Sequence, residues 1–473
     1  MKAMVAVGSV WAALGIVLCP GFGAPGDVLW AYQTGGMVES SSPAVSGGCV
    51  YVGSHDYYVY CLDAATGALV WAYQTGDKVQ SSPVVSGGCV YVGSNDNRVY
   101  CLDAATGAPV WSYHTGQWVR SSPAVSEGLV YVGSRDHKVY CLDAATGALV
   151  WYCQPSDEVN SSPAVSGGHV YIGSADNNVY CLDAATGGLV WSYTTGDNVS
   201  SSPAVSGGYV YAASQDDKVY CLDALTGALE WSYQTGNYIL SSPAVSGSRV
   251  YVGGIDDEVY CLDAGTGAEV WRAIGVGYGF SSSPAVSGGY VYIGSRNVPV
   301  QHMDNVHCLD AATGALVWSY QATDEVKSSP AVCGGYVYVG SNDGCVYCIQ
   351  AAAGDPGEWP MFRHDVQRTG EGASVPDPFE ISLNDNWNLI GYMCEDDSSC
   401  ALVDCQIDDG SAIMSWNHAV AAGLVQPYVY YYVSPHGYRI LATAGGDDDS
   451  WRSKLGYWLL NQSGGPLTLR IPR

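Results

Sequence analysis

Basic residues are scarce in this chain of 473 residues. Lysine and arginine together number 18 against 45 aspartates and glutamates, which gives a formal net charge of -27 at pH 7. Proteins that bind a phosphate backbone need clustered lysine and arginine side chains to displace its counterions. The deficit therefore argues against nucleic acid as a partner. The acidic residues are spread along the chain instead of forming one block, which is typical of a soluble acidic surface.

Long hydrophobic runs are absent beyond the N-terminus. The one apolar run extends from Met4 to Leu18 and follows Lys2. At about fifteen residues it is shorter than the roughly 20 that a membrane-spanning helix needs. We predict a cleaved signal peptide over residues 1–24 and an exported protein of the periplasm, cell surface or medium with no membrane span. Leu18 before Cys19 argues against lipid attachment, because that position of a lipoprotein signal takes a small residue.

Catalytic and metal-binding motifs are also missing. The nine histidines are scattered, no HExxH or GxSxG pattern occurs, and no two of the 17 cysteines are adjacent. Cys345 and Cys348 form a CxxC string, but positions i and i+3 of a strand point to opposite faces, which argues against a zinc or redox site. One aspartate per turn, as at Asp96 and Asp136, is too few ligands for calcium and is better explained by turn capping. We expect no catalytic residue and no metal.

The sequence does contain a repeat of forty residues. Ser81-Ser82-Pro83 recurs at residues 41, 121, 161, 201 and 241 and, after small changes of length, at 282 and 328, which makes eight copies. Within the copy that starts at Ser81, four runs rich in Val, Tyr and Trp are separated by turn residues: 82–85, 89–93, 99–102 and 109–113. Four antiparallel strands per copy and eight copies predict an all-β fold, an eight-bladed β-propeller.

One tryptophan per copy lies on the predicted outermost strand. Such a side chain can pack between adjacent blades, bury about 150 to 250 Å² and direct its indole N–H at a backbone carbonyl of the neighbour. We expect this structural docking role for Trp30, Trp71, Trp111, Trp151, Trp191, Trp231, Trp271 and Trp318. Closure of the ring is ambiguous, because Trp359 follows Cys348 at nearly the same spacing. We predict that the strand from Val28 to Gln33 completes the eighth blade and that residues 352–370 form an irregular strap.

Eight cysteines are equivalent in the copies. Adjacent blades pack at roughly 10 Å, beyond the ~7 Å between Cα atoms that a disulfide can bridge. We therefore expect free, buried thiols at Cys61, Cys101, Cys141, Cys181, Cys221, Cys261, Cys308 and Cys348. A bridge across neighbouring strands from Cys49 to Cys61, or from Cys89 to Cys101, is the less favoured alternative.

The turn Asp-Ala-Ala-Thr-Gly followed by tryptophan, as at Asp63 to Trp71 and Asp103 to Trp111, carries a family resemblance. It resembles the tryptophan-docking motif of the pyrroloquinoline quinone (PQQ) repeat superfamily. Members include the propellers of quinoprotein dehydrogenases and the propeller subunit of the outer-membrane protein assembly machinery. The resemblance covers about residues 27–370 and implies the fold. It does not imply a function, because the docking residues are structural in every member.

Comparison of the copies separates two faces of the predicted disc. The turns Ser-Gly-Gly and Asp-Ala-Ala-Thr-Gly hardly change, whereas the residue before Ser-Ser-Pro and the turn between the second and third strands vary. In an up-and-down blade the two variable turns emerge on one face, and the only sizeable insertion, near residues 297–302, interrupts one of them. We predict a binding surface there, around the channel mouth. Its candidate residues are Glu39, Gln80, Arg120, Asn160 and Lys327, and the same position is occupied in the other copies by Ser200, Leu240 and Phe280.

Two functions fit these features. Quinoprotein dehydrogenases hold PQQ and calcium on such a face with Glu, Asn and Asp side chains, usually beside a disulfide of adjacent cysteines. This chain has no adjacent cysteines and no long blade insertions, and Glu39 is the only acid among the candidates. We therefore expect a non-catalytic, monomeric scaffold without a cofactor, which binds a protein or glycan of the cell envelope. The alternative is a PQQ-dependent alcohol or sugar dehydrogenase.

The repeat ends near Pro376-Asp377-Pro378, where the composition changes. Runs such as Val429 to Val433 and Gly456 to Leu460 predict strands of a small β domain. It is weakly similar to β-modules at the ends of secreted and cell-surface proteins. Of Cys394, Cys400 and Cys405, we expect one unspecified pair to form a disulfide. The predicted organisation is a signal peptide at 1–24, the propeller at 25–371 and a β-sandwich-like domain at 372–473.

Overall fold

A computed structural model describes residues 24–296 and 305–351 in full and, beyond them, the backbone of eight further strands. Strands account for all the regular secondary structure of these described parts. No helix among them has the length and apolar character needed to cross a membrane. The predicted signal peptide, the strap at 352–370 and the C-terminal cysteines lie outside the described residues.

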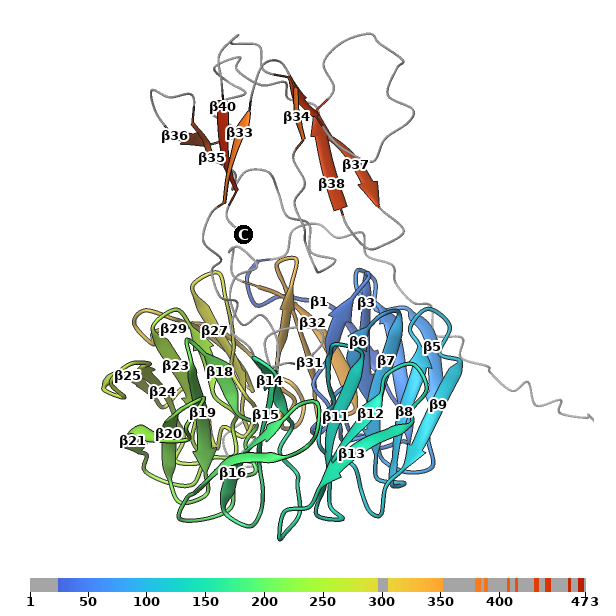
Figure 1. Cartoon of the computed structure of the whole chain (residues 1–473), viewed down its shortest axis with the longest axis vertical. Coiled ribbons are helices and arrows are strands. Elements are labelled where there is room, and N and C mark those ends of the chain that lie inside the picture. Colours follow the sequence, from blue (N-terminus) through green and yellow to red (C-terminus); the bar gives the residue numbers. More distant parts are fainter. Residues whose placement is uncertain are drawn as a thin grey trace, which may run out of the picture. The chain divides into compact units, whose positions relative to one another are not determined.

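Residues 28–350 form eight four-stranded antiparallel sheets, which are the blades of a propeller (Figure 1). We number them blades 1 to 8 in the order of their first strands. Blade 1 has the order β2-β3-β4-β5, and blades 2 to 7 repeat it along the chain up to β26-β27-β28-β29. The first strands of successive blades contact one another around the ring, which places them next to the central channel. The predicted eight-bladed fold is confirmed.

The strands at each position of the blade have nearly equal lengths. The first strands are β2 (Ala44–Ser46), β6 (Val84–Ser86), β10 (Ala124–Ser126), β14 (Ala164–Ser166), β18 (Ala204–Ser206), β22 (Ala244–Ser246), β26 (Ala285–Ser287) and β30 (Ala331–Cys333). The second strands are β3 (Cys49–Gly53), β7 (Cys89–Ser94), β11 (Leu129–Ser134), β15 (His169–Gly173), β19 (Tyr209–Ser214), β23 (Arg249–Gly253), β27 (Tyr290–Gly294) and β31 (Tyr336–Gly340).

The outer half of each blade is as regular as the inner half. The third strands are β4 (Tyr58–Asp63), β8 (Arg98–Asp103), β12 (Lys138–Asp143), β16 (Asn178–Asp183), β20 (Lys218–Asp223), β24 (Glu258–Asp263), β28 (Val306–Asp310) and β32 (Cys345–Gln350). The fourth strands are β5 (Leu69–Gln74), β9 (Pro109–His114), β13 (Leu149–Cys153), β17 (Leu189–Thr194), β21 (Leu229–Gln234), β25 (Glu269–Ile274), β29 (Leu316–Tyr320) and, in blade 8, β1 (Val28–Gln33).

The ring closes through the N-terminal strand. Blade 8 has the order β1-β32-β31-β30, and β1 pairs antiparallel with β32, with Trp30 opposite Cys348. Figure 1 shows the blue strand β1 beside the orange strand β32. The prediction that Val28 to Gln33 completes the eighth blade is therefore confirmed, and Trp30 occupies the docking position.

Each docking tryptophan joins its blade to the next one. Trp71 donates its indole N–H to the carbonyl of Ala104 at 2.9 Å, and its ring packs on Gly107 of the same neighbour. Gly107 has φ +71°, and an added Cβ would lie 2.7 Å from the Trp71 ring, so that the turn requires glycine. The same bond to the next blade is made by Trp30, Trp111, Trp151, Trp191, Trp231 and Trp271. Among the described residues, the indole N–H of Trp318 has no acceptor.

The core lies between the blades and contains the eight equivalent cysteines. All eight are buried, and their thiols are free. Cys49 and Cys89 are also free, so the alternative of cross-strand bridges is not realised. Burial raises the pKa of Cys141 and of Cys181 to about 12, which makes these thiols unreactive at neutral pH.

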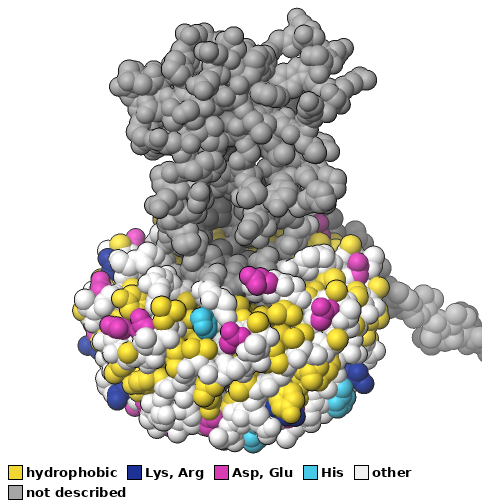
Figure 2. Space-filling model, viewed as in Figure 1, with side chains coloured by type: hydrophobic (Ala, Val, Ile, Leu, Met, Phe, Trp, Pro, Cys, Tyr) yellow, Lys and Arg dark blue, Asp and Glu magenta, His cyan; other side chains and the backbone are white. Residues whose placement is uncertain are grey.

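The outer strands carry the exposed apolar surface. Val110 is 52% exposed on β9 and Val150 is 47% exposed on β13, and the other fourth strands expose similar side chains. Figure 2 shows these hydrophobic side chains over the side of the propeller, with acidic side chains scattered among them. On the face in view, the acidic side chains are thus as scattered as the sequence indicates.

The contacts of the chain divide it into two compact units, residues 1–373 and residues 374–473. In the second unit, one four-stranded sheet has the order β33 (Phe379–Leu383), β40 (Leu467–Ile471), β35 (Gln406–Asp408) and β36 (Ile413–Ser415). Two ribbons pair β34 (Trp387–Leu389) with β39 (Trp458–Leu460), and β37 (Val429–Val433) with β38 (Arg439–Thr443). The β-sandwich-like arrangement of this region stays a prediction.

Candidate functional site

A closed ring of serines lies around the central channel. The second serine of each Ser-Ser-Pro segment donates its backbone N–H to the hydroxyl of the equivalent serine in the next blade, for example Ser82 to Ser122 at 2.9 Å. Ser329 donates to Ser42 at 3.0 Å and completes the circle. The ring consists of Ser42, Ser82, Ser122, Ser162, Ser202, Ser242, Ser283 and Ser329.

The first serine of each segment fixes the segment to its own blade. Ser81 accepts the N–H of Gly93 on β7 at 3.0 Å, and Ser121 accepts that of Gly133 on β11 at 2.9 Å. Strand β6 therefore begins only at Val84, whereas the sequence predicts a start at Ser82. The difference arises because the backbone N–H of Ser82 bonds to the neighbouring blade instead of to β7.

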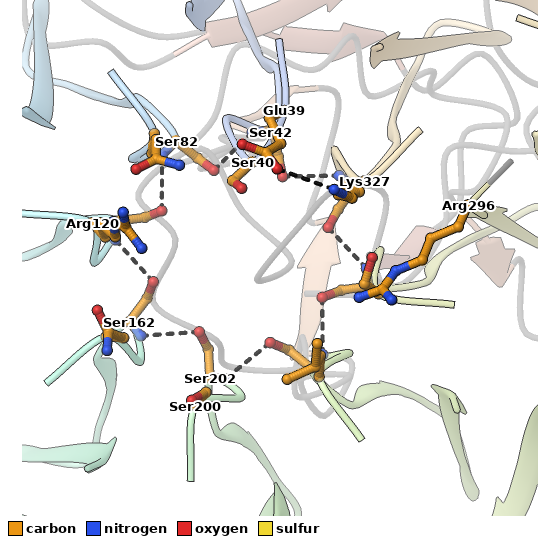
Figure 3. Close-up of a pocket in the computed structure, with 18 residues that line it drawn as sticks. Glu39, Ser40, Ser42, Ser82, Arg120, Ser162, Ser200, Ser202, Arg296 and Lys327 are labelled. Atoms are coloured by element: carbon orange, nitrogen blue, oxygen red, sulfur yellow. Dashed lines mark hydrogen bonds and ion pairs between the residues drawn. The ribbon is translucent and has the colours of Figure 1, made fainter. Parts of the chain in front are cut away.

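The serine ring borders a cavity of about 360 Å³ at the channel mouth (Figure 3). Glu39, Gln80, Arg120, Asn160 and Lys327 all line it, so the structure brings the five principal candidates together. Their role in binding stays a prediction. Ser200 and Leu240 line the same cavity from blades 5 and 6.

The assignment of Phe280 to the mouth is wrong. Phe280 is fully buried, and its N–H bonds to the carbonyl of Gly254, the pattern that Val79 shows with Ser54. The extra serine of the seventh copy shifts the alignment by one residue, so Ser281 lines the cavity instead. Comparison of the copies by their buried valine would have revealed this shift.

One further lining residue, Arg296, and one aromatic neighbour of Arg120, Trp118, escaped the sequence analysis. Arg296 lines the cavity from the end of β27, immediately before the insertion of the seventh copy, and that insertion was the only signal for it. Trp118 lies two residues before Arg120 and is 39% exposed. The guanidinium carbons of Arg120 and Arg135 lie 4.9 and 5.2 Å from the centre of its ring.

Most mouth residues are held by neighbouring side chains. Gln80 accepts a hydrogen bond from Asn95 at 2.9 Å. Asn160 accepts one from Arg135 at 3.2 Å and donates to Glu158 at 3.2 Å, while Arg135 and Glu158 form an ion pair at 2.8 Å. These contacts join the residue before Ser-Ser-Pro to the turn between the second and third strands, so the two variable turns lie on one face as predicted.

Glu39 and Lys327 form an ion pair across blades 1 and 8. Their charged atoms are 3.1 Å apart, and Lys327 also contacts Glu325 at 2.9 Å. Burial alone would raise the pKa of Glu39, but the hydrogen bond and charge of Lys327 outweigh it and hold that pKa below the usual value. His55 lies 3.3 Å from Glu39, yet burial lowers the pKa of His55, so the imidazole is neutral at pH 7.

The aspartates of the variable turns cap backbone groups. Asp96 accepts the N–H of Arg98 at 3.1 Å within its turn, the N–H of Gly76 at 2.7 Å from the preceding blade, and the hydroxyl of Tyr100 at 2.6 Å. The predicted capping role is therefore confirmed. Within residues 24–296 and 305–351, no three side chains of the kind that bind metals are grouped together.

The fold and the mouth together define a class of protein: an eight-bladed repeat propeller with a constant polar ring below a variable rim. The model of the outer membrane protein assembly factor BamB family matches residues 21–118, 95–200, 175–272 and 255–375, and the chain belongs to this family. No curated protein matches it.

Two solved structures have the same fold. BamB from Moraxella catarrhalis is 21% identical, with a TM-score of 0.60, and the match covers 68% of this chain and 99% of that one. The computationally designed Ika8 protein is also 21% identical at a TM-score of 0.60, and the match covers 67% of this chain and 98% of that one. At this identity the likeness concerns the fold alone.

Proposed function

We propose that this protein is a non-catalytic scaffold of the cell envelope that binds a partner protein through the variable face of its propeller. One observation carries the proposal: the residue before Ser-Ser-Pro changes between most blades around the mouth, although the serine ring beneath it is constant. Positions that make the same structural contact in every blade keep the same residue. Exposed positions on turns are free of that constraint and can differ to suit a partner. The family's description as an assembly factor supports a protein partner, and the apolar run at the N-terminus supports export.

The alternative, a PQQ-dependent dehydrogenase, fits the mouth poorly. Calcium needs several oxygen ligands, usually carboxylates, and the quinone needs a nearby base. Of the described residues that line the cavity, Glu39 alone carries a carboxylate, and it is already paired with Lys327. Arg120, Arg296 and Lys327 place three positive charges in the same cavity, and these would repel a calcium ion.

The scaffold role is tested by capture of partners from an extract of the native envelope. The triple variant Arg120→Ala, Asn160→Ala and Lys327→Ala changes the mouth from three blades. Gln350→Ala, Arg249→Ala and Arg272→Ala together form the control, because these residues lie on β32, β23 and β25, outside the mouth and its variable turns. We expect the mouth variant to lose the partner and the control to retain it. Equal capture by both would place the binding surface elsewhere.

The enzymatic alternative has its own test. Purified protein is mixed with PQQ and calcium, and dye-linked oxidation of alcohols and sugars is recorded together with quinone absorbance. We expect no turnover. Stoichiometric binding of the quinone accompanied by turnover would replace the scaffold proposal with a dehydrogenase.

A further inference from the structure

The channel mouth has the opposite charge balance to the rest of the protein. The chain has 27 more acidic than basic residues. Among the described residues, the mouth cavity is instead lined by the cations Arg120, Arg296 and Lys327 and by a single carboxylate, that of Glu39. A local excess of positive charge on an acidic protein attracts anions selectively, because the surrounding surface repels them.

The three cations differ in how they are neutralised. Lys327 has two carboxylates, of Glu39 and Glu325, at 3.1 and 2.9 Å. Among the described residues, neither Arg120 nor Arg296 forms an ion pair, and the buried Nε of each has no hydrogen-bond partner. Burial and the neighbouring Arg135 lower the pKa of Arg120 and outweigh the opposite effect of the Glu158 and Glu39 carboxylates. A buried donor without an acceptor costs free energy that a bound acceptor would recover.

The two arginines face each other across the channel. Arg120 belongs to blade 3 and Arg296 to blade 7, which are opposite members of an eight-bladed ring. Figure 3 shows their side chains on opposite sides of the cavity. Arg120 is held in place by the ring of Trp118, with which its guanidinium makes a cation–π contact at 4.9 Å. The site is therefore partly organised before any ligand binds.

The border of the cavity supplies further donors. In the serine ring, hydroxyls such as those of Ser122 and Ser162 accept a backbone N–H, and a hydroxyl that accepts still carries a proton to donate. Guanidinium groups cannot accept hydrogen bonds, so a ligand for this cavity must be rich in acceptors. A guanidinium fork matches the planar carboxylate in a bidentate manner.

We propose that the mouth cavity binds carboxylate groups, and that these belong to an acidic segment of the partner protein. This inference rests on the proposed scaffold function and identifies the chemistry that the mouth recognises. A cavity of about 360 Å³ accommodates side chains of an extended segment but not a folded domain. The partly exposed ring of Trp118 beside Arg120 offers the segment an apolar contact, and aromatic and arginine residues are the ones that dominate binding energy at interfaces.

The probe is fluorescein-labelled hexaglutamate, and its binding to the full chain is followed by fluorescence anisotropy at low salt. Arg120→Gln with Arg296→Gln removes both unpaired guanidinium groups. Loss of one charge-assisted pair weakens binding about ten-fold, so the double variant should bind roughly 100-fold more weakly. Arg249→Gln with Arg272→Gln removes the same charge from β23 and β25, outside the mouth, and should leave binding unchanged. Hexaglutamine should not bind.

Three results would overturn the inference. The first is equal hexaglutamate binding by the wild type and the variant with Arg120→Gln and Arg296→Gln. The second is an equal loss of affinity in that variant and in the control with Arg249→Gln and Arg272→Gln, and the third is binding of citrate without binding of hexaglutamate. The second result would mean that only the net charge matters, and the third that the ligand is a small anion. The double variant Arg120→Lys and Arg296→Lys keeps both positive charges but removes the bidentate geometry of the guanidinium groups. Its loss of affinity for hexaglutamate should lie between those of the wild type and the double glutamine variant. Thermal melting confirms that each variant is folded.

Failure of this inference can be distinguished from failure of the scaffold role. The triple alanine variant of the mouth could lose its partner while hexaglutamate neither binds to the wild type nor competes with that partner. This result would support the scaffold role and disprove the carboxylate site. If hexaglutamate binds to the mouth but the triple alanine variant still captures every partner, the scaffold role through the mouth is disproved.

Discussion

The backbone N–H of Ser329 donates to the hydroxyl of Ser42 across 3.0 Å, and this one bond joins residues 287 positions apart in the chain. It is equivalent to seven other bonds that link neighbouring blades, such as Ser122 to Ser162 at 2.9 Å. The first and last blades are therefore joined at the channel in the same way as any two consecutive blades. Four predictions follow from this symmetry and from the contacts between blades.

Ser42→Ala and Ser162→Ala should destabilise the propeller equally. Each substitution leaves one buried backbone N–H without its acceptor, that of Ser329 or that of Ser122, at a cost of about 1 to 3 kcal/mol. Chemical denaturation of both variants measures the two costs. A silent Ser42→Ala beside a destabilising Ser162→Ala would show that the ring is open between blades 8 and 1.

Trp111→Ala should lower the free energy of unfolding by about 3 to 5 kcal/mol, because it removes a large side chain from between two blades. It also leaves the carbonyl of Ala144 without the indole N–H that now lies at 2.9 Å. Val110→Ala on the same strand is the control. Val110 is 52% exposed, and its loss should change stability by no more than about 0.5 kcal/mol. Similar costs for both would contradict the docking role.

Gly107→Ala should be more destabilising than Gly87→Ala. Both glycines have positive φ angles, +71° and +58°, so both substitutions meet the backbone strain of about 1 to 2 kcal/mol. Only at Gly107 would the added Cβ also lie 2.7 Å from the ring of Trp71, whereas at Gly87 nothing lies within 4 Å. The difference between the two melting temperatures isolates the contact between blades, and its absence would disprove that contact.

Asp103→Asn should remove a stabilisation that depends on pH. The side-chain hydroxyl and the backbone N–H of Thr106 bind Oδ1 of Asp103 at 2.7 and 2.8 Å and lower the pKa of this carboxyl. The folded chain then binds its proton less readily than the unfolded chain, so the stabilisation is present above the ordinary carboxyl pKa of about 4 and disappears as the pH falls below it.

Thermal melting between pH 7 and pH 3 measures this effect. The wild type should melt above the variant at neutral pH, and the difference should shrink as the solution becomes acidic. A difference that grew toward low pH would have the wrong sign. The same hydrogen bonds lower the pKa of the equivalent carboxyls, so the whole propeller should lose stability in acid; these are Asp63, Asp143, Asp183, Asp223, Asp263 and Asp310.

The candidate site was only partly predictable. Glu39, Gln80, Arg120, Asn160 and Lys327 were found because a position that varies in an otherwise constant repeat is visible by comparison of the copies. Ser281 was missed because the extra serine of the seventh copy shifts the alignment. Arg296 was missed because it lies in the turn after β27, whereas the candidates were taken only from the position before Ser-Ser-Pro.

The sequence by itself determined the number of blades, the strands in each blade and the docking role of the tryptophans, because a repeat encodes the same local contacts in every copy. Only the tertiary structure decided which tryptophan closes the ring and which mouth charges have no ion-pair partner in the part of the chain that is described. Pairing between β1 and β32 depends on residues more than 300 positions apart. Lys327 is neutralised by Glu39 of another blade, whereas the Nε of Arg120 has no hydrogen-bond partner among the described residues. The distance between such blades is not recorded in any local pattern of the sequence.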